Sequence, residues 1–452
     1  MRPRELLAVS IAAALLAWQL LLPGFIGLAN NGDFGKIAGS LCIGGPDEGV
    51  DNFVFFRSDY VRDAAHCYYA RIPSSEHALA WIASAIELRL ADPLRFDIRW
   101  LGALHAIAWL AAYALLLISI RPLNGIRWWI AAAASILIFF DVAYVSYLNS
   151  FYTDVAAMIG AFAMVAIFPA MLDRPAWTPV FAAAALLFVT SKAQHALLFA
   201  IPVLTLVWFA ISAGKRRAGA LVCVAASLAI AAAALSTIRS GPDWSTVQPR
   251  FNLIFYKLLP RSDSPARDAA ELGLTPDDLK YIGTHSFLPG TPTTDPDWVR
   301  AFRARSGSAT LLRFYLRHPS VAIRFLGDDL AKEAPLIRAG NLSNYRREDG
   351  HAPGAHTSRM SAWSALRSGL FRLWPAHMVL IYALAIVAGV WTRNWVVLFA
   401  AALGAGEFAI ASLGDALETN RHLLLFHFFT DSMIFFAAVR PVRTQSGMPM
   451  PS

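Results

Sequence analysis

Residues 149–172 read NSFYTDVAAMIGAFAMVAIFPAML, and positions 155–172 of this stretch contain no charged residue. A spanning helix needs about 20 mostly apolar residues, because its backbone must satisfy its own hydrogen bonds across about 30 Å of hydrocarbon. The rest of the chain follows the same pattern: 57% of its 452 residues are hydrophobic and 15% are charged, against about 25% charge in soluble proteins. Stretch and composition together predict a polytopic membrane protein.

Apolar runs on both sides of this stretch predict an all-α polytopic membrane protein with about ten transmembrane helices. The expected spans are 6–27, 98–120, 128–147, 155–172, 176–191, 194–213, 218–237, 376–391, 395–412 and 422–439. The predicted divisions are a transmembrane module of seven spans at 1–237 with an outer loop at 28–96, a mostly helical extracytoplasmic insertion at 238–374, three spans within 375–441, and a cytoplasmic tail at 442–452. We expect the first span to be an uncleaved anchor, because its apolar stretch exceeds the roughly 7–15 residues of a signal peptide.

Basic residues between the spans orient the chain, because short cytoplasmic loops are enriched in Lys and Arg. With the amino terminus inside, eleven basic residues lie at the inner ends of the spans, opposed by Glu5 and Asp173. The eleven are Arg2, Arg4, Arg121, Arg127, Arg174, Lys215, Arg216, Arg217, Arg393, Arg440 and Arg443. The inner fringe thus carries +9, and the remaining 28 basic and 29 acidic residues nearly cancel. We expect a cytoplasmic (inner) membrane protein with both termini cytoplasmic, and no basic patch is left for nucleic acid.

The two long outer segments carry further signals. Cys42 and Cys67 both fall in the first of them, where disulfides are permitted, and we expect them to be bonded; two free buried thiols are the alternative. Residues 77–91 are apolar with charges only late in the run, which predicts a helix lying at the membrane interface. In the second segment, helices are expected around 295–306, 308–317 and 319–333.

Polar residues gather in four loops next to the spans, where they are costly and therefore mark candidate functional sites. All four loops lie on the outer side of the topology derived from charge. They cover residues 30–36, 149–154, 190–195 and 414–422. The inner loops, in contrast, are short and basic. The outer ends of the spans are therefore the expected site.

These polar residues also have purely structural interpretations. Asn and Gly at 30–33 favour a turn, and Asp154 suits a helix N-cap. Lys192 and His195 are compatible with an interfacial position. Arg421 could form a salt bridge with Glu418 or Asp415.

Ionisable residues inside the spans are fewer. Asp141 lies in the third span, and His427 and Asp431 lie one helical turn apart in the tenth. We expect His427 and Asp431 to form a structural pair across one helix face rather than a proton relay.

One carboxylate among several cations and amides suits transfer from a lipid-linked phosphate. An attacking hydroxyl must lose its proton, which a positioned Asp can accept, while the departing phosphate already carries negative charge well. Glycoside hydrolases need two carboxylates because their leaving alcohol must be protonated. Phosphate departure requires cationic stabilisation instead, which Lys192, His195 and Arg421 could provide.

At these residues the chain resembles the GT-C superfamily of polytopic glycosyltransferases, which use polyprenyl-phosphate sugars outside the cytoplasmic membrane. The stretches Asn-Asn-Gly-Asp-Phe-Gly-Lys at 30–36, Asn-Ser-Phe-Tyr-Thr-Asp at 149–154 and Glu-Thr-Asn-Arg-His at 418–422 are similar to motifs of bacterial surface-glycan hexose transferases in that group. The resemblance covers about 400 residues as architecture. It implies a hexosyltransferase that moves a sugar from a polyprenyl-phosphate carrier to an extracytoplasmic glycan or lipid acceptor within the membrane lipids.

The resemblance also implies roles for individual residues. Asp33 would be the general base, and Lys192 and Arg421, with His195, would bind the donor phosphate. The substrate-binding candidates are Asn30, Asn31, Tyr152, Asp154, Gln194 and Glu418. The chain lacks the Asp-Asp or Glu-x-Asp pair found in the first loop of other members, so we expect no metal and no cofactor.

By the same resemblance, the last three spans vary with the substrate. Glu407 and the 415–421 loop would then belong to a variable, lipid-facing part. The insertion at 238–374 would cover the acceptor groove.

Three other classes of protein remain open. A transporter or flippase of lipid-linked sugars predicts ionisable residues at the bilayer midplane and internal repeats; the chain shows few of the former and no repeat. A polymerase or ligase of lipid-linked glycans shares the outer-face chemistry and differs in substrate size. An acyltransferase would use a membrane-embedded His, for which His105 and His427 are the candidates.

Overall fold

The computed structural model describes residues 1–45, 51–67, 72–212 and 217–439. The predicted tail at 442–452 and the orientation residues Lys215, Arg216, Arg440 and Arg443 lie outside the described residues. Most described residues are helical, and the all-α polytopic class is confirmed.

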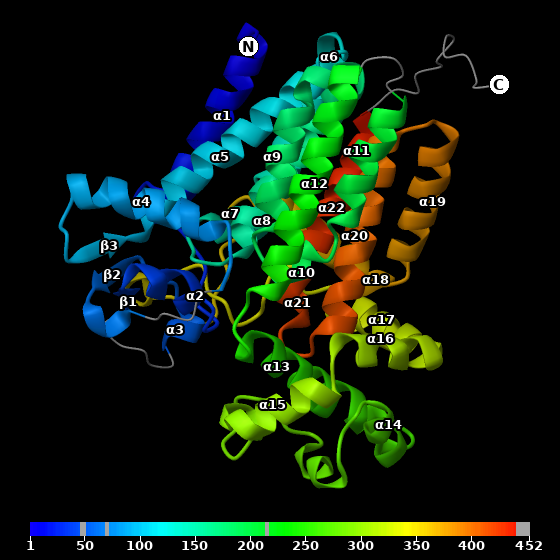
Figure 1. The fold of residues 1–452 in the computed structure, drawn as a ribbon. Helices are drawn as coiled ribbons and strands as arrows, with labels where there is room; N and C mark the ends of the chain where they lie inside the picture. Colours follow the sequence, from blue (N-terminus) through cyan, green and yellow to red (C-terminus); the bar gives the residue numbers. More distant parts are fainter. Residues whose placement is uncertain (46–50, 68–71, 213–216, 440–452) are drawn as a thin grey trace.

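The membrane part is a bundle of long apolar helices (Figure 1). Its helices are α1 (Pro3–Leu20), α5 (Ile98–Ser119), α6 (Gly125–Phe139), α7 (Val142–Val145), α8 (Asp154–Asp173), α9 (Thr178–Val189), α10 (Ala193–Ala196), α11 (Ala200–Ser212), α12 (Arg217–Arg239), α18 (Ala362–Leu373), α19 (His377–Trp391), α20 (Trp395–Gly414), α21 (Thr419–His422) and α22 (Leu424–Val439). Within the described residues, six helices are long and apolar enough to cross a membrane, or up to eight if each bent pair is one span.

Each of the ten predicted spans corresponds to helix in the structure. Six meet the length and hydropathy of a span, and 175–189 and 424–439 are shorter apolar helices. The remaining two belong to bent pairs: α6 and α7 differ in direction by 48°, and α18 and α19 by 110°. Helix α18, which the sequence assigned to the insertion, precedes the membrane helix α19 across this bend.

Helix α8 lies at the centre of the bundle and is buried on all sides. Its neighbour α9 approaches closely at Gly160, where a Cβ atom would stand only 2.7 Å from the backbone nitrogen of Phe188. Such contact is possible only where small residues face each other, and it drives helix association inside lipid. The amino end of α8, which carries Asp154, is thereby fixed.

The segment between α1 and α5 combines short helices with a small antiparallel sheet that the sequence did not reveal. The elements are α2 (Gly35–Ala38), α3 (Asp51–Val54), α4 (Glu76–Leu90), β1 (Ile43–Gly44), β2 (Asp59–Arg62) and β3 (Arg95–Asp97), in the sheet order β1-β2-β3. Strands of two to four residues are too short to show alternation. Helix α4 matches the helix predicted at 77–91 and lies to the side of the bundle, next to the end of α5 (Figure 1).

A disulfide joins Cys42 and Cys67, which are 25 positions apart and flank β1 and β2 of the sheet. Replacing both cysteines with serine should destabilise this segment by about 2–4 kcal/mol, because the cross-link restricts the unfolded chain. Limited proteolysis of the purified protein should then show faster cleavage within 28–96. The control is Cys223→Ala, which removes the free buried cysteine of α12 and should leave that cleavage rate unchanged. Equal protease resistance of the double serine variant and the wild type would contradict the expectation.

The insertion is helical, as predicted, with its own aromatic core. It contains α13 (Trp244–Phe251), a π-helix (Asn252–Leu258), α14 (Pro265–Glu271), α15 (Pro296–Arg305), α16 (Ser308–Arg317) and α17 (Pro319–Lys332). The last three confirm the helices expected at 295–306, 308–317 and 319–333. Figure 1 shows the sheet and the insertion at the end of the bundle opposite the amino terminus.

Candidate functional site

The turn after α1 presents Asp33 at the end of the bundle. Asn30 Oδ1 accepts the backbone N–H groups of Gly32 (2.8 Å) and Phe34 (3.1 Å), and Asn31 Oδ1 accepts that of Asp33 (3.1 Å). Gly32 has φ +100°, a conformation that glycine tolerates without strain. The structural interpretation of Asn30 as a turn residue therefore holds, and the turn fixes the position of the Asp33 carboxylate.

Arg421 is the centre of the site and brings three of the four polar loops together. Its Nη2 lies 2.8 Å from Asp33 Oδ2, its Nη1 3.4 Å from Asp154 Oδ2, and its Nε 3.1 Å from Glu418 Oε2. The guanidinium also lies over the ring of Tyr152, 5.1 Å from its centroid. The side chain is only 3% exposed. A buried guanidinium with this many carboxylate partners is held rigidly.

Tyr152 connects the turn to the fourth membrane helix. Its hydroxyl donates to the carbonyl of Ala29 (2.8 Å) and accepts the backbone N–H of Asn31 (3.0 Å). The Asn31 side chain in turn donates to Glu418. Tyr152 is fully buried, so its position supports the turn rather than offering a free hydroxyl.

Behind Arg421 lies a buried layer in which His195 stands between two carboxylates. His195 Nε2 is 3.6 Å from Asp154 Oδ1, and its Nδ1 is 2.7 Å from Glu407 Oε1. Gln194 Nε2 also donates to Glu407 (3.1 Å). Asp154 is the first residue of α8, whose N-cap is Thr153, so the alternative of Asp154 as N-cap does not hold. Its carboxylate instead faces the cations of the site.

Glu407 corrects an expectation. The resemblance placed it in a variable, lipid-facing part, but its side chain is 0% exposed and bonded to His195 and Gln194. A charged group in a span is stable only with a partner inside the bundle.

Lys192 and His422 form the other side of the site. Lys192 Nζ lies 3.5 Å from Asp154 Oδ1 and 3.1 Å from His422 Nδ1. His422 Nε2 lies 3.1 Å from Asp415 Oδ2, and Asp33 Oδ1 is 2.5 Å from Lys36 Nζ. All four polar loops therefore meet at one place.

The charged groups of the site shift one another's pKa values. Burial would raise the pKa of Asp33, but Lys36, Arg421 and Lys192 outweigh it and hold that pKa well below its usual value. Burial lowers the pKa of Lys192, because the attraction of Asp154 does not fully compensate. Burial, with Lys192 and Arg421, also lowers the pKa of His422. At neutral pH Asp33 is thus a carboxylate and His422 is neutral.

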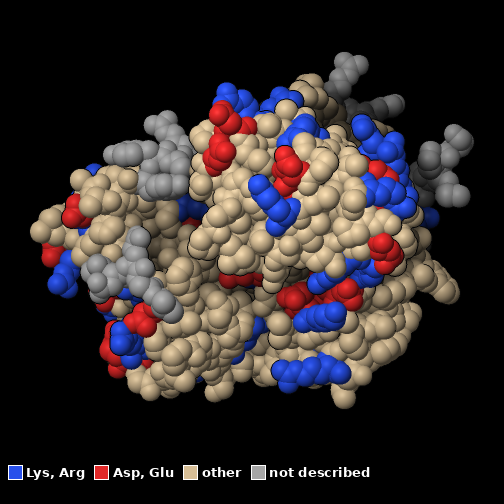
Figure 2. Space-filling view, turned by 90° about the horizontal axis from the view of Figure 1, so that it is seen from below, with Lys and Arg blue, Asp and Glu red and all other residues tan. Residues whose placement is uncertain are grey.

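The site has an outer and an inner layer. The side chains of Asp33 and Lys192 are 23% and 20% exposed, and Lys36 is similarly accessible. Arg421, Asp154, His195 and Glu407 lie behind them. Figure 2 views the molecule from this end and shows acidic and basic side chains together at the bottom of a furrow across the face. A ligand would meet one carboxylate and two ammonium groups first.

All ten residues selected from the sequence for catalysis or binding lie in this cluster or support it directly. The residues selected from the sequence for catalysis or binding did not include Lys36, Glu407, Asp415 and His422. Three of these stand inside the quoted polar loops, so the loops themselves were the signal. Glu407 is an isolated acid in an apolar run, which is itself a signal of a buried partner.

A second buried charge cluster lies in the bundle, and it corrects the predicted pairing of His427 with Asp431. Arg367 of α18 binds Asp431 Oδ1 (2.5 Å) and approaches His427 Nδ1 (3.4 Å), while Tyr144 donates to Asp431 Oδ2 (2.5 Å). The sequence could not reveal this partner, because α18 reaches α22 only through the bend before α19. The cluster joins α18, α22 and α7.

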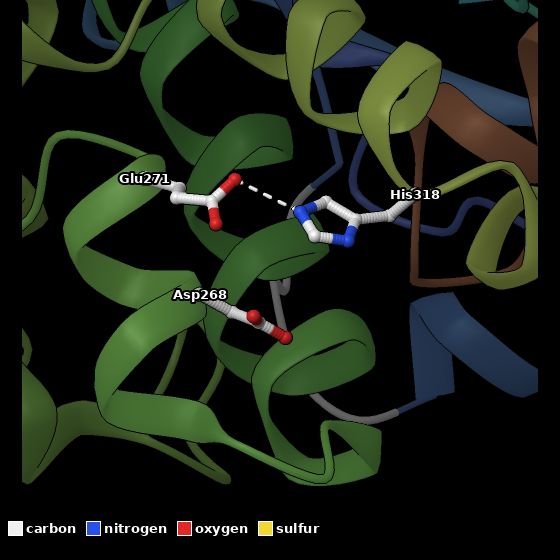
Figure 3. A group of neighbouring side chains, drawn as sticks. All are labelled: Asp268, Glu271 and His318. Carbon is white, nitrogen blue, oxygen red and sulfur yellow. Dashed lines mark hydrogen bonds and ion pairs between the residues drawn. The ribbon is translucent and has the colours of Figure 1, made fainter.

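In the described part of the chain, one group of three side chains has ligand atoms within 4.8 Å of one another, as a metal ion would need: Asp268, Glu271 and His318 (Figure 3). His318 Nε2 is 2.8 Å from Glu271 Oε2. Asp268 already accepts from Ser262 (2.5 Å) and pairs with Arg267 (3.1 Å). We interpret the group as a structural contact between α14 and the start of α17, within the insertion.

Fold and site together define a polytopic membrane protein with a charged site at one end of its helix bundle, of the glycosyltransferase type. The chain belongs to the family described as YfdI N-terminal transmembrane domain, whose model matches residues 2–448. The family is GT-C-like, so the resemblance to the GT-C superfamily is confirmed. The chain is therefore a multi-pass membrane protein related to GT-C glycosyltransferases.

One solved structure that matches the chain is the archaeal oligosaccharyltransferase AglB from Archaeoglobus fulgidus, in complex with an inhibitory peptide and a dolichol-phosphate. The identity is 13% and the TM-score 0.44, over 97% of this chain and 50% of that one. The chain thus spans about half the length of that protein. No curated protein matches the chain.

Proposed function

We propose that this protein transfers a sugar, a hexose, from a polyprenyl-phosphate carrier to a glycan or lipid acceptor on the extracytoplasmic side of the inner membrane. The observation that carries the proposal is that Asp33 and Lys192 form the accessible layer of the site, and that Asp33 contacts the Arg421 guanidinium directly behind it. A base for the acceptor and cations for the departing phosphate then stand side by side. Both termini would be cytoplasmic, and the divisions at 237/238 and 374/375 remain part of the proposal.

In the proposed reaction the acceptor hydroxyl attacks the anomeric carbon of the sugar. The bond from that carbon to the acceptor oxygen forms, and the bond to the phosphate oxygen breaks with its electron pair. Asp33 takes the proton of the hydroxyl, and Arg421 and Lys192 stabilise the charge on the departing phosphate. No step uses a metal or cofactor, and no nucleic acid is a partner.

The other selected residues would support this arrangement. Both His195 nitrogens face carboxylates, and the ring is buried, so we assign it to the support of Asp154 rather than to direct phosphate contact. Asn31 and Glu418 lie at the accessible edge, where a sugar hydroxyl could replace their mutual hydrogen bond. Asn30, Tyr152 and Gln194 are expected to hold the loops in place.

A deletion strain tests the proposal. It should accumulate the polyprenyl-linked sugar, and a surface glycan or lipid should lose the mass of one sugar residue. Complementation with the wild-type gene should restore both. Loss of a flippase would instead leave the lipid-linked sugar on the cytoplasmic leaflet, and loss of a ligase or polymerase would change the mass by a whole glycan unit. Either outcome would contradict the proposal.

A further inference from the structure

The ammonium of Lys257 lies where the insertion meets the loop that carries Arg421. It donates to Asp329 Oδ2 (2.7 Å), to the carbonyl of Ser412 (2.8 Å) and to that of Asp415 (3.4 Å). A lysine ammonium has three N–H donors, and each of these has one acceptor. The side chain is 4% exposed. Such a fully paired buried lysine fixes the groups around it.

The two carbonyls belong to the end of α20 and to the residue that follows it. The last carbonyls of a helix lack partners within the helix, and a cation there is favourable. Lys257 comes from the π-helix of the insertion, and Asp329 of α17 balances its charge. Figure 1 shows α17 beside the end of α20. The insertion thus caps the membrane helix that leads into the site.

A continuous set of contacts leads from this cap to the phosphate candidates. Asp415 Oδ1 accepts the backbone N–H of Ala416 (2.7 Å), and its Oδ2 lies 3.1 Å from His422 Nε2. Glu418 has φ +54°, a left-handed conformation that a residue with a side chain keeps only where its surroundings impose it. Its carbonyl accepts the backbone N–H of Arg421 (2.9 Å). The position of Arg421 therefore depends on the backbone conformation at the start of the 415–422 segment.

We infer that Lys257 is a positioning residue for the site: by holding the end of α20 and the carbonyl of Asp415, it makes the extracytoplasmic insertion set the position of Arg421 and His422. The identity of the ligand rests on the proposed function, whereas the positioning itself does not.

The test uses the full-length protein in lipid nanodiscs and the variants Lys257→Met and Lys257→Met/Asp329→Leu. Hydrogen exchange of the 412–422 backbone, measured without ligand, should accelerate in both. Binding of polyprenyl monophosphate should weaken about tenfold in both, as expected for loss of hydrogen bonds to a charged group. The double variant leaves no unpaired buried carboxylate, so its melting temperature should recover while exchange and affinity do not. Lys257→Arg should retain part of the protection from hydrogen exchange and part of the affinity for polyprenyl monophosphate.

The matched control is Lys332→Met on α17, which removes an exposed ammonium (67%) paired with Asp328. It should change neither readout. Unchanged exchange in Lys257→Met, or recovery of exchange and affinity in the double variant, would overturn the inference. Failure of the wild type to bind polyprenyl monophosphate would contradict the proposed function instead, and the exchange comparison would still decide whether Lys257 positions the loop.

Discussion

Arg421→Gln should reduce sugar transfer by on the order of 10²–10³-fold, because truncating one partner of a buried charge pair costs roughly 2–5 kcal/mol. The guanidinium contacts three carboxylates, those of Asp33, Asp154 and Glu418. Its removal takes the main cation from the proposed phosphate position and leaves the buried Asp154 under-compensated. The measurement is release of polyprenyl phosphate from a polyprenyl-phosphate sugar by the purified protein in nanodiscs.

Three further variants separate function from folding. Arg421→Lys keeps the charge but loses the planar guanidinium that reaches three carboxylates, so it should recover little activity. Arg421→Gln/Asp154→Asn removes the uncompensated carboxylate and should regain thermal stability without regaining activity. Arg300→Gln, at an exposed arginine of α15 paired with Asp297, is the matched control and should be fully active. A stable Arg421→Gln protein with more than about a tenth of wild-type turnover would show that the arginine does not bind the phosphate.

The membrane fold could be predicted because each span is encoded locally. An apolar run of sufficient length has few alternatives in lipid, and 155–172 shows this without any knowledge of its neighbours. The bends between consecutive helices could not be predicted in the same way. The break between α18 and α19 follows from a local backbone change near Pro375, but whether a helix continues straight or turns by 110° depends on packing against α22.

The sequence predicted which loops form the site, but not which of their residues contact one another. Asp33 and Arg421 are 388 positions apart, and no local pattern states that they touch. Topology alone places four polar loops on one side of the membrane; it does not choose partners among them. Glu407 is the clearest example. In the sequence it is a single acid within a span, whereas its role follows from its contact with His195 on another helix.

Asp33→Asn should reduce transfer by about 10²–10⁴-fold, the usual contribution of a general base, while the protein stays folded. The amide cannot accept the acceptor's proton, yet it fills the same space and keeps one oxygen toward Arg421. Turnover in nanodiscs should be compared with the glycans of a deletion strain complemented by wild type or variant. Asp33→Glu, which keeps a carboxylate but moves it, should retain measurable activity. Full turnover by a well-expressed Asp33→Asn protein would rule out this base.

The pKa of Asp33 gives the same prediction a pH dependence. In the free protein Lys36, Arg421 and Lys192 outweigh burial and hold this pKa below the usual aspartate value, so the carboxylate is ionised but weakly basic. A bound donor phosphate competes for Arg421 and Lys192 and should raise that pKa. Protonation of Asp33 should therefore depress kcat/KM only below the usual aspartate range, about pH 4, whereas the acid limb of kcat should lie at higher pH. Lys36→Met removes the strongest of the lowering charges and should shift the kcat/KM limb upward; an unshifted limb would mean that another group titrates.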